Sequence, residues 1–414
     1  MSSTLPLPTR RQPPSRALLV PPQPLVPPGS RGRARVRRSQ GAVRVVVLAI
    51  VTFTALITAA SCTPPPPCSA WAGGGSASLQ AAVNANGCVT VPPGTWHLTT
   101  HVVLPAGHIL TGQSGMANVT VLTADPSPAW GCCSGMIDVN PRNPLSTANS
   151  AIRHLTLQAA HHAVIGVGGG VFDLSDVAVD ATVCNGLSIY GPRVRVDSSR
   201  FSENGLGASC PRAPPGAAIY IHNVAGNPIG PPTITKSSFS HNGSPIDVDS
   251  VDGGQLIGNT FTNNDGWASV ALYRASFWTV TDNLIDHPKT TILGNNPGGN
   301  FSYQRGCQFG PLGGHPAAIW LCENFNTDGH FADHNTIARN TLASYYAVEF
   351  MGLDDPQERG QRTVAPRFNS TTDNRVTAGV LGLADDYEPH QPAGGDNVWA
   401  RNNCPGHPCL PRYF

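Results

Sequence analysis

A short segment that recurs about every 22–24 residues constrains this chain more than any other feature of its sequence. Each copy has six positions: an apolar residue, two variable residues, a residue that is usually Ser or Asn, another variable residue, and a last residue that is usually apolar. The six copies begin at residues 172, 196, 234, 256, 280 and 337, with insertions in the two longer intervals. Such a period, with β-prone segments between turns, indicates a solenoid whose stacked coils bury their inward side chains. The regular leucine positions of a leucine-rich repeat are absent.

Three copies are followed by an asparagine at the same distance: Asn204, Asn242 and Asn264. The first two of these precede a glycine. Because Asn and Gly tolerate left-handed backbone angles, we expect a turn at this point of each coil.

The segment before the repeats has the order of an end cap. Residues 78–84 (SLQAAVN) have helix-compatible apolar spacing, with Ser78 as the cap residue. The segments VTVPPGTW (89–96), LPAG (104–107) and ILTG (109–112) follow. This order resembles the pectate lyase superfamily, whose members begin with such a helix and such strands.

The resemblance covers residues 75–385 and implies an all-β fold: a single-stranded right-handed parallel β-helix with an amino-terminal helical cap. Residues 386–414 are then a carboxy-terminal tail or cap. The resemblance leaves the reaction open, because the superfamily includes lyases, hydrolases, epimerases and non-catalytic adhesins.

The first 61 residues differ from the rest, with nine arginines and no acidic residue. We expect a disordered, basic, proline-rich leader over 1–44, a hydrophobic signal segment over 45–61 and a linker over 62–74. The small residues before Cys62 favour a cleaved export signal over an uncleaved anchor. They also resemble a bacterial lipoprotein box, although Ala59 stands where leucine is usual. We therefore expect a secreted or cell-surface protein, lipidated at Cys62 and touching the membrane only through the signal or the lipid.

Export changes the charge that matters. From Cys62 onward, 17 basic residues face 25 acidic ones, a net charge of −8. Such a surface disfavours nucleic acid and anionic membranes. It also disfavours a polyuronate unless a divalent cation bridges the two. We expect a monomer without a nucleic-acid partner.

Eleven cysteines fit an oxidising compartment, since setting Cys62 aside leaves an even number. Sequence-local pairs would be 68 with 88, 184 with 210, 307 with 322 and 404 with 409, while Cys132 and Cys133 bond each other or other partners. No C-x-x-C pair supports a metal site instead.

A second strand can be aligned in six coils, beginning at residues 187, 219, 246, 270, 319 and 348. Alternation buries the first and third residue of each and turns the second and fourth outward. The outward set is Ser188, Tyr190, Tyr220, His222, Asp247, Asp249, Ala271, Tyr273, Trp320, Cys322, Glu349 and Met351, with Arg274 and Glu323 just beyond their strands. At about 4.8 Å per coil these residues would form a ribbon about 25 Å long.

This ribbon has the composition of a glycan cleft. Aromatic faces stack on sugar rings and carboxylates accept hydroxyl hydrogen bonds. The expected substrate-binding residues are Tyr190, Tyr220, Tyr273, Trp320 and Glu349. The alternative interpretation is a solvated strand face with ordinary β-prone tyrosines.

Asp247 and Asp249 are the sharpest catalytic candidates. Two residues apart on one strand, their side chains start about 6.6 Å apart, close to the carboxyl separation of an inverting glycosidase. They could equally hold calcium, or be solvated acids. In a lyase, His222, Arg274 or Tyr273 would remove the proton beside a uronic carboxylate. Glu323 completes the catalytic candidates.

Two further features lie between residues 288 and 334. The insertion 288–316 enters directly before Trp320 and would overhang the ribbon. The motif NTDG (326–329) resembles the first motif of polygalacturonases, but two other motifs of that family are missing, and a turn is the alternative. His330, Asp333 and His334 follow as surface-turn residues or metal ligands.

The sequence therefore predicts an exported β-helix enzyme, lyase or hydrolase, whose partner is an extracellular polysaccharide. No cofactor is required, although calcium could take part. The alternatives are a non-catalytic glycan-binding or adhesive β-helix and a structural envelope lipoprotein.

Overall fold

The structure is a computed structural model, and one compact unit runs from Pro66 to Phe414. The described residues are 67–115, 117–124, 135–140, 147–191, 193–206, 216–223, 230–287, 316–322, 332–351, 366–378, 382–385, 396–406, 409 and 412–413. The expected leader, signal segment and lipidation at Cys62, together with Glu323, lie outside these residues. Among the helices in the described ranges, none is both long and apolar enough to cross a bilayer.

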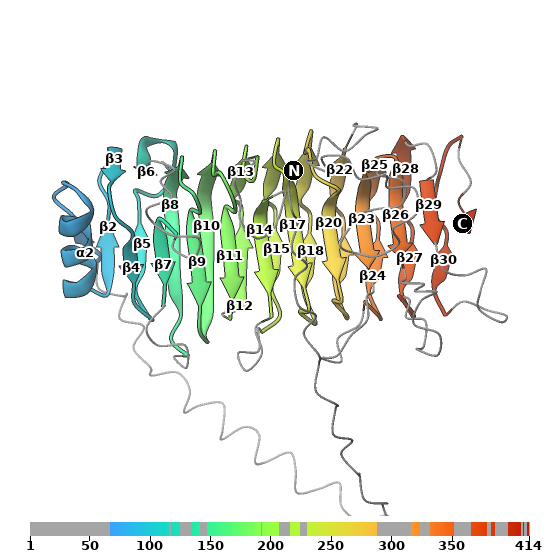
Figure 1. Cartoon of the computed structure of the whole chain (residues 1–414), viewed down its shortest axis with the longest axis horizontal. Coiled ribbons are helices and arrows are strands. Elements are labelled where there is room, and N and C mark those ends of the chain that lie inside the picture. Colours follow the sequence, from blue (N-terminus) through green and yellow to red (C-terminus); the bar gives the residue numbers. More distant parts are fainter. Residues whose placement is uncertain are drawn as a thin grey trace, which may run out of the picture. The chain divides into compact units, whose positions relative to one another are not determined.

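The described strands stack into three ladders in which every pairing is parallel (Figure 1). The first ladder contains β1 (Ser69–Ala70), β2 (Cys88–Thr90), β5 (Ile109–Thr111), β8 (Ser150–Gln158), β10 (Val171–Asp180), β12 (Arg193–Asp197), β15 (Thr233–Thr235), β18 (Gln255–Ile257), β21 (Thr279–Thr281), β24 (Thr336–Ala338), β27 (Ser370–Thr372) and β30 (Val398–Ala400). The second contains β3 (Gly94–Leu98), β6 (Thr120–Ala124), the distal halves of β8 and β10, β13 (Arg200–Ser202), β16 (Ser238–Ser240), β19 (Thr260–Thr262), β22 (Leu284–Asp286), β25 (Thr341–Ala343) and β28 (Arg375–Ala378).

The third ladder contains β4 (Val102–Leu104), β7 (Ile137–Val139), β9 (Val164–Val167), β11 (Leu187–Tyr190), β14 (Ala217–His222), β17 (Ser244–Asp249), β20 (Ala268–Tyr273), β23 (Ala317–Cys322), β26 (Tyr346–Met351), β29 (Gly382–Asp385) and β31 (Arg412–Tyr413). A short 3-10 helix, η1, spans Ala117–Val119. Each coil visits the three ladders in turn and returns one step along the stack. The fold is a right-handed parallel β-helix, as the sequence predicted.

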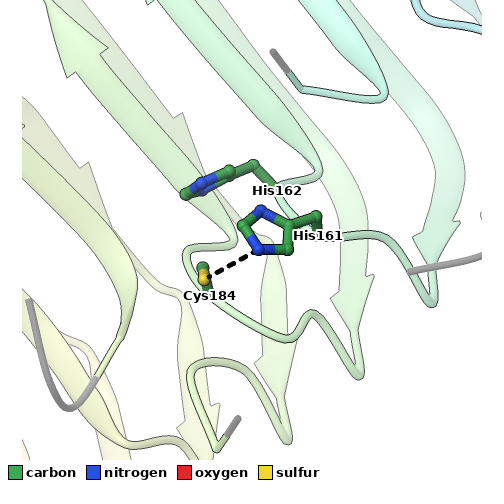
Figure 2. A group of neighbouring side chains, drawn as sticks. All are labelled: His161, His162 and Cys184. Atoms are coloured by element: carbon green, nitrogen blue, oxygen red, sulfur yellow. Dashed lines mark hydrogen bonds between the residues drawn. The ribbon is translucent and has the colours of Figure 1, made fainter. Parts of the chain in front are cut away.

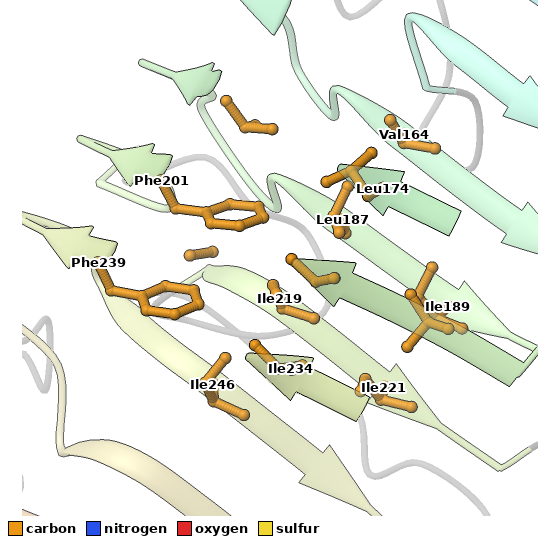
Figure 3. Close-up of a cluster of buried hydrophobic side chains, with 14 of the residues drawn as sticks. Val164, Leu174, Leu187, Ile189, Phe201, Ile219, Ile221, Ile234, Phe239 and Ile246 are labelled. Carbon is orange, nitrogen blue, oxygen red and sulfur yellow. The ribbon is translucent and has the colours of Figure 1, made fainter. Parts of the chain in front are cut away.

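Each repeat copy spans the corner between the first and second ladders. Val196 pairs with Ile234 across β12 and β15, and Phe201 pairs with Phe239 across β13 and β16. The phenylalanine rings stack inside the coil, with 5.0 Å between the centroids of Phe201 and Phe239 (Figure 3). The centroids of Phe239 and Phe261 are 4.8 Å apart. The apolar ends of each copy therefore form the interior.

The first copy is out of register in the sequence prediction. Leu174, not Phe172, pairs with Val196, and Val179 pairs with Phe201, so the copy begins at residue 174. The error arose because β10 runs unbroken through the corner, and its alternating apolar residues fit two registers.

Asparagines stabilise this corner from inside. The backbone N–H of Asn259 donates to Oδ1 of Asn283 over 2.8 Å, and the N–H of Asn283 donates to Oδ1 of Asn340 over 3.0 Å. All three side chains are buried. They satisfy backbone groups that the corner would otherwise leave unpaired in the interior.

Asn204, Asn242 and Asn264 form a second such column at the next corner, where the sequence predicted a turn. Asn242 Nδ2 donates to Asn264 Oδ1 over 3.1 Å. The expected left-handed angle is present at Gly205, with φ of 75°, but the asparagines themselves are not left-handed. The residue before each asparagine is left-handed instead, such as Glu203 with φ of 57° and His241 with φ of 54°. These asparagines serve as hydrogen-bonding side chains.

The amino-terminal helix α2 (Ser76–Ala85) covers the first coil, with Leu79 and Val83 fully buried. Gln80 acts as an edge partner for β4: its Oε1 accepts from Val103 N over 2.6 Å and its Nε2 donates to Val103 O over 2.9 Å. The expected helical cap is thus present. Ser78 is not its cap residue, because the helix starts earlier and the Ser78 hydroxyl donates to Gly75 O.

Two expected disulfides are present, Cys68–Cys88 and Cys404–Cys409. Cys184 and Cys322 are also disulfide-bonded, as expected, but the cysteines proposed for them, 210 and 307, lie outside the described residues, as do Cys132 and Cys133.

Beyond residue 385 the stack of coils continues, because β30 pairs with β27 and β31 pairs with β29.

Candidate functional site

The outward face of the third ladder carries the predicted ribbon in the predicted register. One row of paired positions contains Ser188, Tyr220, Asp247, Ala271, Trp320 and Glu349. A second row of paired positions contains His222, Asp249, Tyr273, Cys322 and Met351, and the ring of Tyr190, next to this row, has its centroid 6.5 Å from that of His222. The intervening residues, such as Ile219 and Ile221, are fully buried in the interior (Figure 3).

Part of this face is not open to solvent, which corrects the sequence prediction. Trp320 is 4% exposed, and Cys322 and Glu349 are 0% exposed, although all three occupy outward positions. Trp320 and Cys322 belong to an apolar cluster separate from the interior core, which also contains Tyr346 and has Trp267 packed against it. Apolar contacts on the outer face therefore displace solvent from this part of the ribbon.

The half-buried aromatic and charged residues of these rows lie in a shorter region, here called the outer window, together with Arg274 just beyond β20: Tyr190, Tyr220, His222, Asp247, Asp249, Tyr273 and Arg274. Towards the amino terminus the same row continues into Asp138, Ile165 and Ser188, which are buried. The outer window spans β11, β14, β17 and β20, so it covers three coil steps, or about 14 Å, and not the expected 25 Å.

Asp249 lies at the centre of a hydrogen-bonded group. Its Oδ1 accepts from Arg274 Nη2 over 2.7 Å and from the Ser250 hydroxyl over 2.8 Å. Its Oδ2 lies 3.0 Å from His222 Nδ1. Burial alone would raise the pKa of Asp249, but the interactions with His222, Ser250 and Arg274 outweigh it and hold this pKa below its ordinary value. Asp249 is therefore a carboxylate at neutral pH.

Asp247 is in the opposite state. Among the described residues its carboxyl has no hydrogen-bond partner, and burial, followed by the charge of Asp249, raises its pKa to about 7. His222 opposes this shift only in part. Two carboxyls on one strand thus differ in protonation near neutral pH. Such divergence is typical of acid–base pairs in active sites.

Aromatic groups surround this pair. The rings of Tyr190 and Tyr220 meet edge to face with centroids 6.2 Å apart, and Tyr220 stacks on His222 at 5.8 Å. The guanidinium of Arg274 lies 4.5 Å from the centroid of the Tyr273 ring. Burial and the nearby carboxylates raise the pKa of Tyr220, so its hydroxyl keeps its proton and can donate a hydrogen bond.

The structure therefore brings together four of the predicted catalytic residues, His222, Asp247, Asp249 and Arg274, and three of the predicted aromatics. Ser250 was missed, because a serine beside an aspartate carries no sequence signal until its left-handed backbone, with φ of 58°, is known.

The contact between Asp249 and Arg274 also bears on whether the site could hold calcium. A cation at Asp249 would have to displace the guanidinium 2.7 Å away, so this donor set suits calcium poorly.

His161, His162 and Cys184 form a second cluster with potential ligand atoms within 4.8 Å of one another (Figure 2). His161 Nε2 lies 3.4 Å from Cys184 Sγ. Cys184 is disulfide-bonded and has no thiolate to offer, so this group does not suit a metal ion.

The segment expected to be a turn or a metal site is only partly described, because residues 326–331 lie outside the described ranges. Asp333 serves a corner of the coil: its Oδ1 accepts from Arg367 N over 2.7 Å, and its own N–H donates to Ser276 Oγ over 3.0 Å. His334 stacks between two phenylalanines. These contacts are those of a turn.

The sequence matches no described protein family and no curated protein. Solved structures with a similar fold include an endo-xylogalacturonan hydrolase from Aspergillus tubingensis (14% identity, 82% of this chain and 93% of that chain, TM-score 0.49). Another is PfbA, a surface adhesin of Streptococcus pneumoniae (11% identity, 82% of this chain and 91% of that chain, TM-score 0.46). A third is ORF18 of Geobacillus virus E2 (13% identity, 80% of this chain and 57% of that chain, TM-score 0.43). The chain thus spans just over half of the viral protein. At these values no activity is transferred to this chain.

Proposed function

We propose that this protein is an exported glycoside hydrolase that cleaves an extracellular polysaccharide across the outer window. The observation that carries the proposal is the pair Asp247 and Asp249, which face the same side of one strand with their pKa values shifted in opposite directions. One carboxyl that keeps its proton and one that is ionised are the two groups that glycoside hydrolysis requires.

In this mechanism Asp247 is the general acid. Its proton passes to the glycosidic oxygen as the bond from that oxygen to the anomeric carbon breaks. The oxygen of a water molecule bonds to the anomeric carbon, and a proton of that water passes to Asp249. The side chains start about 6.6 Å apart, a separation that leaves room for the water and predicts inversion at the anomeric carbon.

The neighbouring groups support these roles. The Arg274 guanidinium and His222 hold Asp249 in its ionised form. Tyr190, Tyr220 and Tyr273 offer ring faces and hydroxyls on both sides of the pair, as sugar recognition requires.

A hydrolase is favoured over a lyase by the electrostatics of the site. A lyase acts on a uronic acid, whose carboxylate must be neutralised while the proton beside it is removed. Arg274 already interacts with Asp249, and the chain from Cys62 onward has a net charge of −8. A neutral glycan meets no such obstacle.

Glycan binding without cleavage is the second candidate, and one observation favours it. Both oxygens of Asp249 already have neighbours, Arg274 and Ser250 at Oδ1 and His222 at Oδ2. A carboxylate so engaged could position a sugar without activating water.

Incubation of the purified protein with neutral and uronic polysaccharides, with and without calcium, tests the proposal. We expect new reducing ends without products that absorb as 4,5-unsaturated sugars, no effect of a chelator, and loss of cleavage in Asp247→Asn and Asp249→Asn. Asp286→Asn, which changes an exposed carboxyl on β22, is the matched control. Retention without cleavage would favour binding alone, and unsaturated products would favour a lyase.

Export rests on the signal-like amino terminus and on the disulfides, which are typical of oxidising compartments. We propose that Cys62 anchors the protein through a lipid and that the exported protein is a monomer. Cys62→Ser should move the protein from the membrane fraction to the soluble fraction, and unchanged fractionation would remove the anchor.

A further inference from the structure

A column of left-handed residues follows the third ladder, at the corner that leads to the first ladder. It contains Gly253, Phe277, His334 and Phe368, with φ of 73°, 62°, 58° and 55°. Hydrogen bonds set them one coil apart: Gly253 N donates to Ser276 O, Phe277 N to Asp333 O and His334 N to Arg367 O. Each member of the column therefore lies directly beside the next.

The three ring-bearing members form an exposed stack. The centroids of Phe277 and His334 are 5.1 Å apart with rings inclined by 16°, and those of His334 and Phe368 are 4.9 Å apart with rings inclined by 24°. These separations match the step between coils, about 4.8 Å. Phe277, at the end of the stack beside Gly253, is 59% exposed.

Gly253 leaves the next place in this stack empty. A Cβ built there would meet, within 4 Å and among the described residues, only Pro231, at 3.7 Å from its Cγ and 3.9 Å from its Cβ. Backbone conformation does not explain the glycine, because Phe277, His334 and Phe368 carry rings at similar φ. One ring face of Phe277 thus borders a slot whose far wall is Pro231. Two coil steps, about 9.6 Å, separate the walls, which leaves room for one ring at normal stacking distance.

We propose that this slot binds one pyranose ring of the polysaccharide, sandwiched between Phe277 and Pro231. The C–H groups on the face of a pyranose carry partial positive charge and pack on the negative face of an aromatic ring. Hydroxyls at the rim of the sugar need polar partners. Asp252 is exposed beside Gly253, and Arg193 lies against Pro231, to whose carbonyl oxygen its Nε donates over 3.0 Å.

The slot and the outer window belong to the same coils. Gly253 follows Asp249 by four residues, and Phe277 follows Tyr273 by four residues. A glycan that leaves the outer window at this edge meets the slot around the corner. The slot is therefore an accessory subsite that holds the chain without touching the bond that is cleaved. Its ligand class rests on the proposed function, while its geometry does not.

Fluorine NMR tests the slot without requiring cleavage. The protein is labelled with 4-fluorophenylalanine, and the Phe277 resonance is assigned by its absence in Phe277→Leu. Methyl glycosides of glucopyranose, galactopyranose and mannopyranose are then titrated in. We expect at least one of them to shift the Phe277 resonance, and Gly253→Phe, which fills the slot with the ring that its neighbours already carry, to abolish the shift. No shift with any glycoside, or an equal shift in Gly253→Phe, would overturn the proposal.

Matched variants separate the slot from the catalytic pair. Asp247→Asn should leave the Phe277 titration unchanged, so a failed hydrolase assignment and a failed slot give different results. On a polysaccharide that the protein retains, Phe277→Ala should weaken retention about three- to tenfold, given the usual strength of ring stacking. Phe368→Ala, at the far end of the same stack, should change it less than twofold, and equal losses in both variants would contradict the proposal.

Discussion

Replacement of Asn283 by Ala is the perturbation that tests the corner ladder most sharply. Asn283 Nδ2 donates to Leu256 O and to Asn340 Oδ1, both over 2.9 Å. Its Oδ1 accepts from the N–H of Asn259 over 2.8 Å and from Asn259 Nδ2 over 3.0 Å. All of these groups are in the interior, and the variant removes one hydrogen bond from each of the four.

A buried polar group without a partner costs about 1–3 kcal/mol. Two of the four groups keep another bond: Asn259 Nδ2 still donates to Ile234 O, and Asn340 Oδ1 still accepts from the N–H of residue 283. The N–H of Asn259 loses its side-chain partner and Leu256 O loses one bond, and we therefore expect the free energy of unfolding to fall by about 2–4 kcal/mol. Such a loss is a large share of the stability of a typical domain.

Denaturant unfolding followed by circular dichroism measures this loss. Asn118→Ala, on the exposed face of η1, is the matched control and should change the midpoint little. A midpoint for Asn283→Ala equal to that of the control would refute the view that asparagine side chains hold the corners together.

Other substitutions test the site and the interior. Asp247→Asn should stabilise the protein at pH 8, by at most about 4 kcal/mol. A carboxyl whose folded pKa is raised to about 7 contributes stability below its unfolded pKa, and this contribution is lost as the pH rises through about 7. An unchanged thermal midpoint at pH 8 would contradict this expectation. Asp249→Asn should act in the opposite sense, since a lowered pKa stabilises the fold at neutral pH, and a raised midpoint would be the adverse result. Phe239→Ala removes the middle ring of the buried stack and should lower the free energy of unfolding in denaturant by about 3–5 kcal/mol. A loss of less than about 1 kcal/mol would mean that the neighbouring rings do not depend on it. Loss of the Cys68–Cys88 disulfide, which links residues 20 apart, should cost about 3 kcal/mol, so a double serine variant as stable as the native protein would exclude a structural role.

The stacking of coils could be predicted from the sequence because two local patterns agree. Alternation decides which residues of a strand point inward, and the recurring corner sets the register between coils. Both outward rows were therefore correct from β11 to β26. The sequence pattern did not identify further coils in which polar residues occupy the repeat positions. One example is the coil of β27, where Thr371 pairs with Ile337 of β24.

The exposure of the outward face could not be predicted in the same way. Trp320 and Glu349 occupy the expected row and are buried, and Trp320 belongs to an apolar cluster with Tyr346 and Trp267 from neighbouring coils. No local pattern encodes such contacts. The pairing of Asp247 and Asp249 was visible from spacing, whereas their opposite pKa shifts depend on burial and on the position of the Arg274 guanidinium.

The pH dependence of kcat/KM for polysaccharide cleavage tests the central claim, that Asp247 donates a proton at neutral pH. Since the carboxyl with a pKa of about 7 must be protonated, cleavage should decline as pH rises through about 7, and Asp247→Asn should bind the glycan but not cleave it at any pH. Full activity of the native protein well above pH 7, or of Asp247→Asn at neutral pH, would contradict the mechanism.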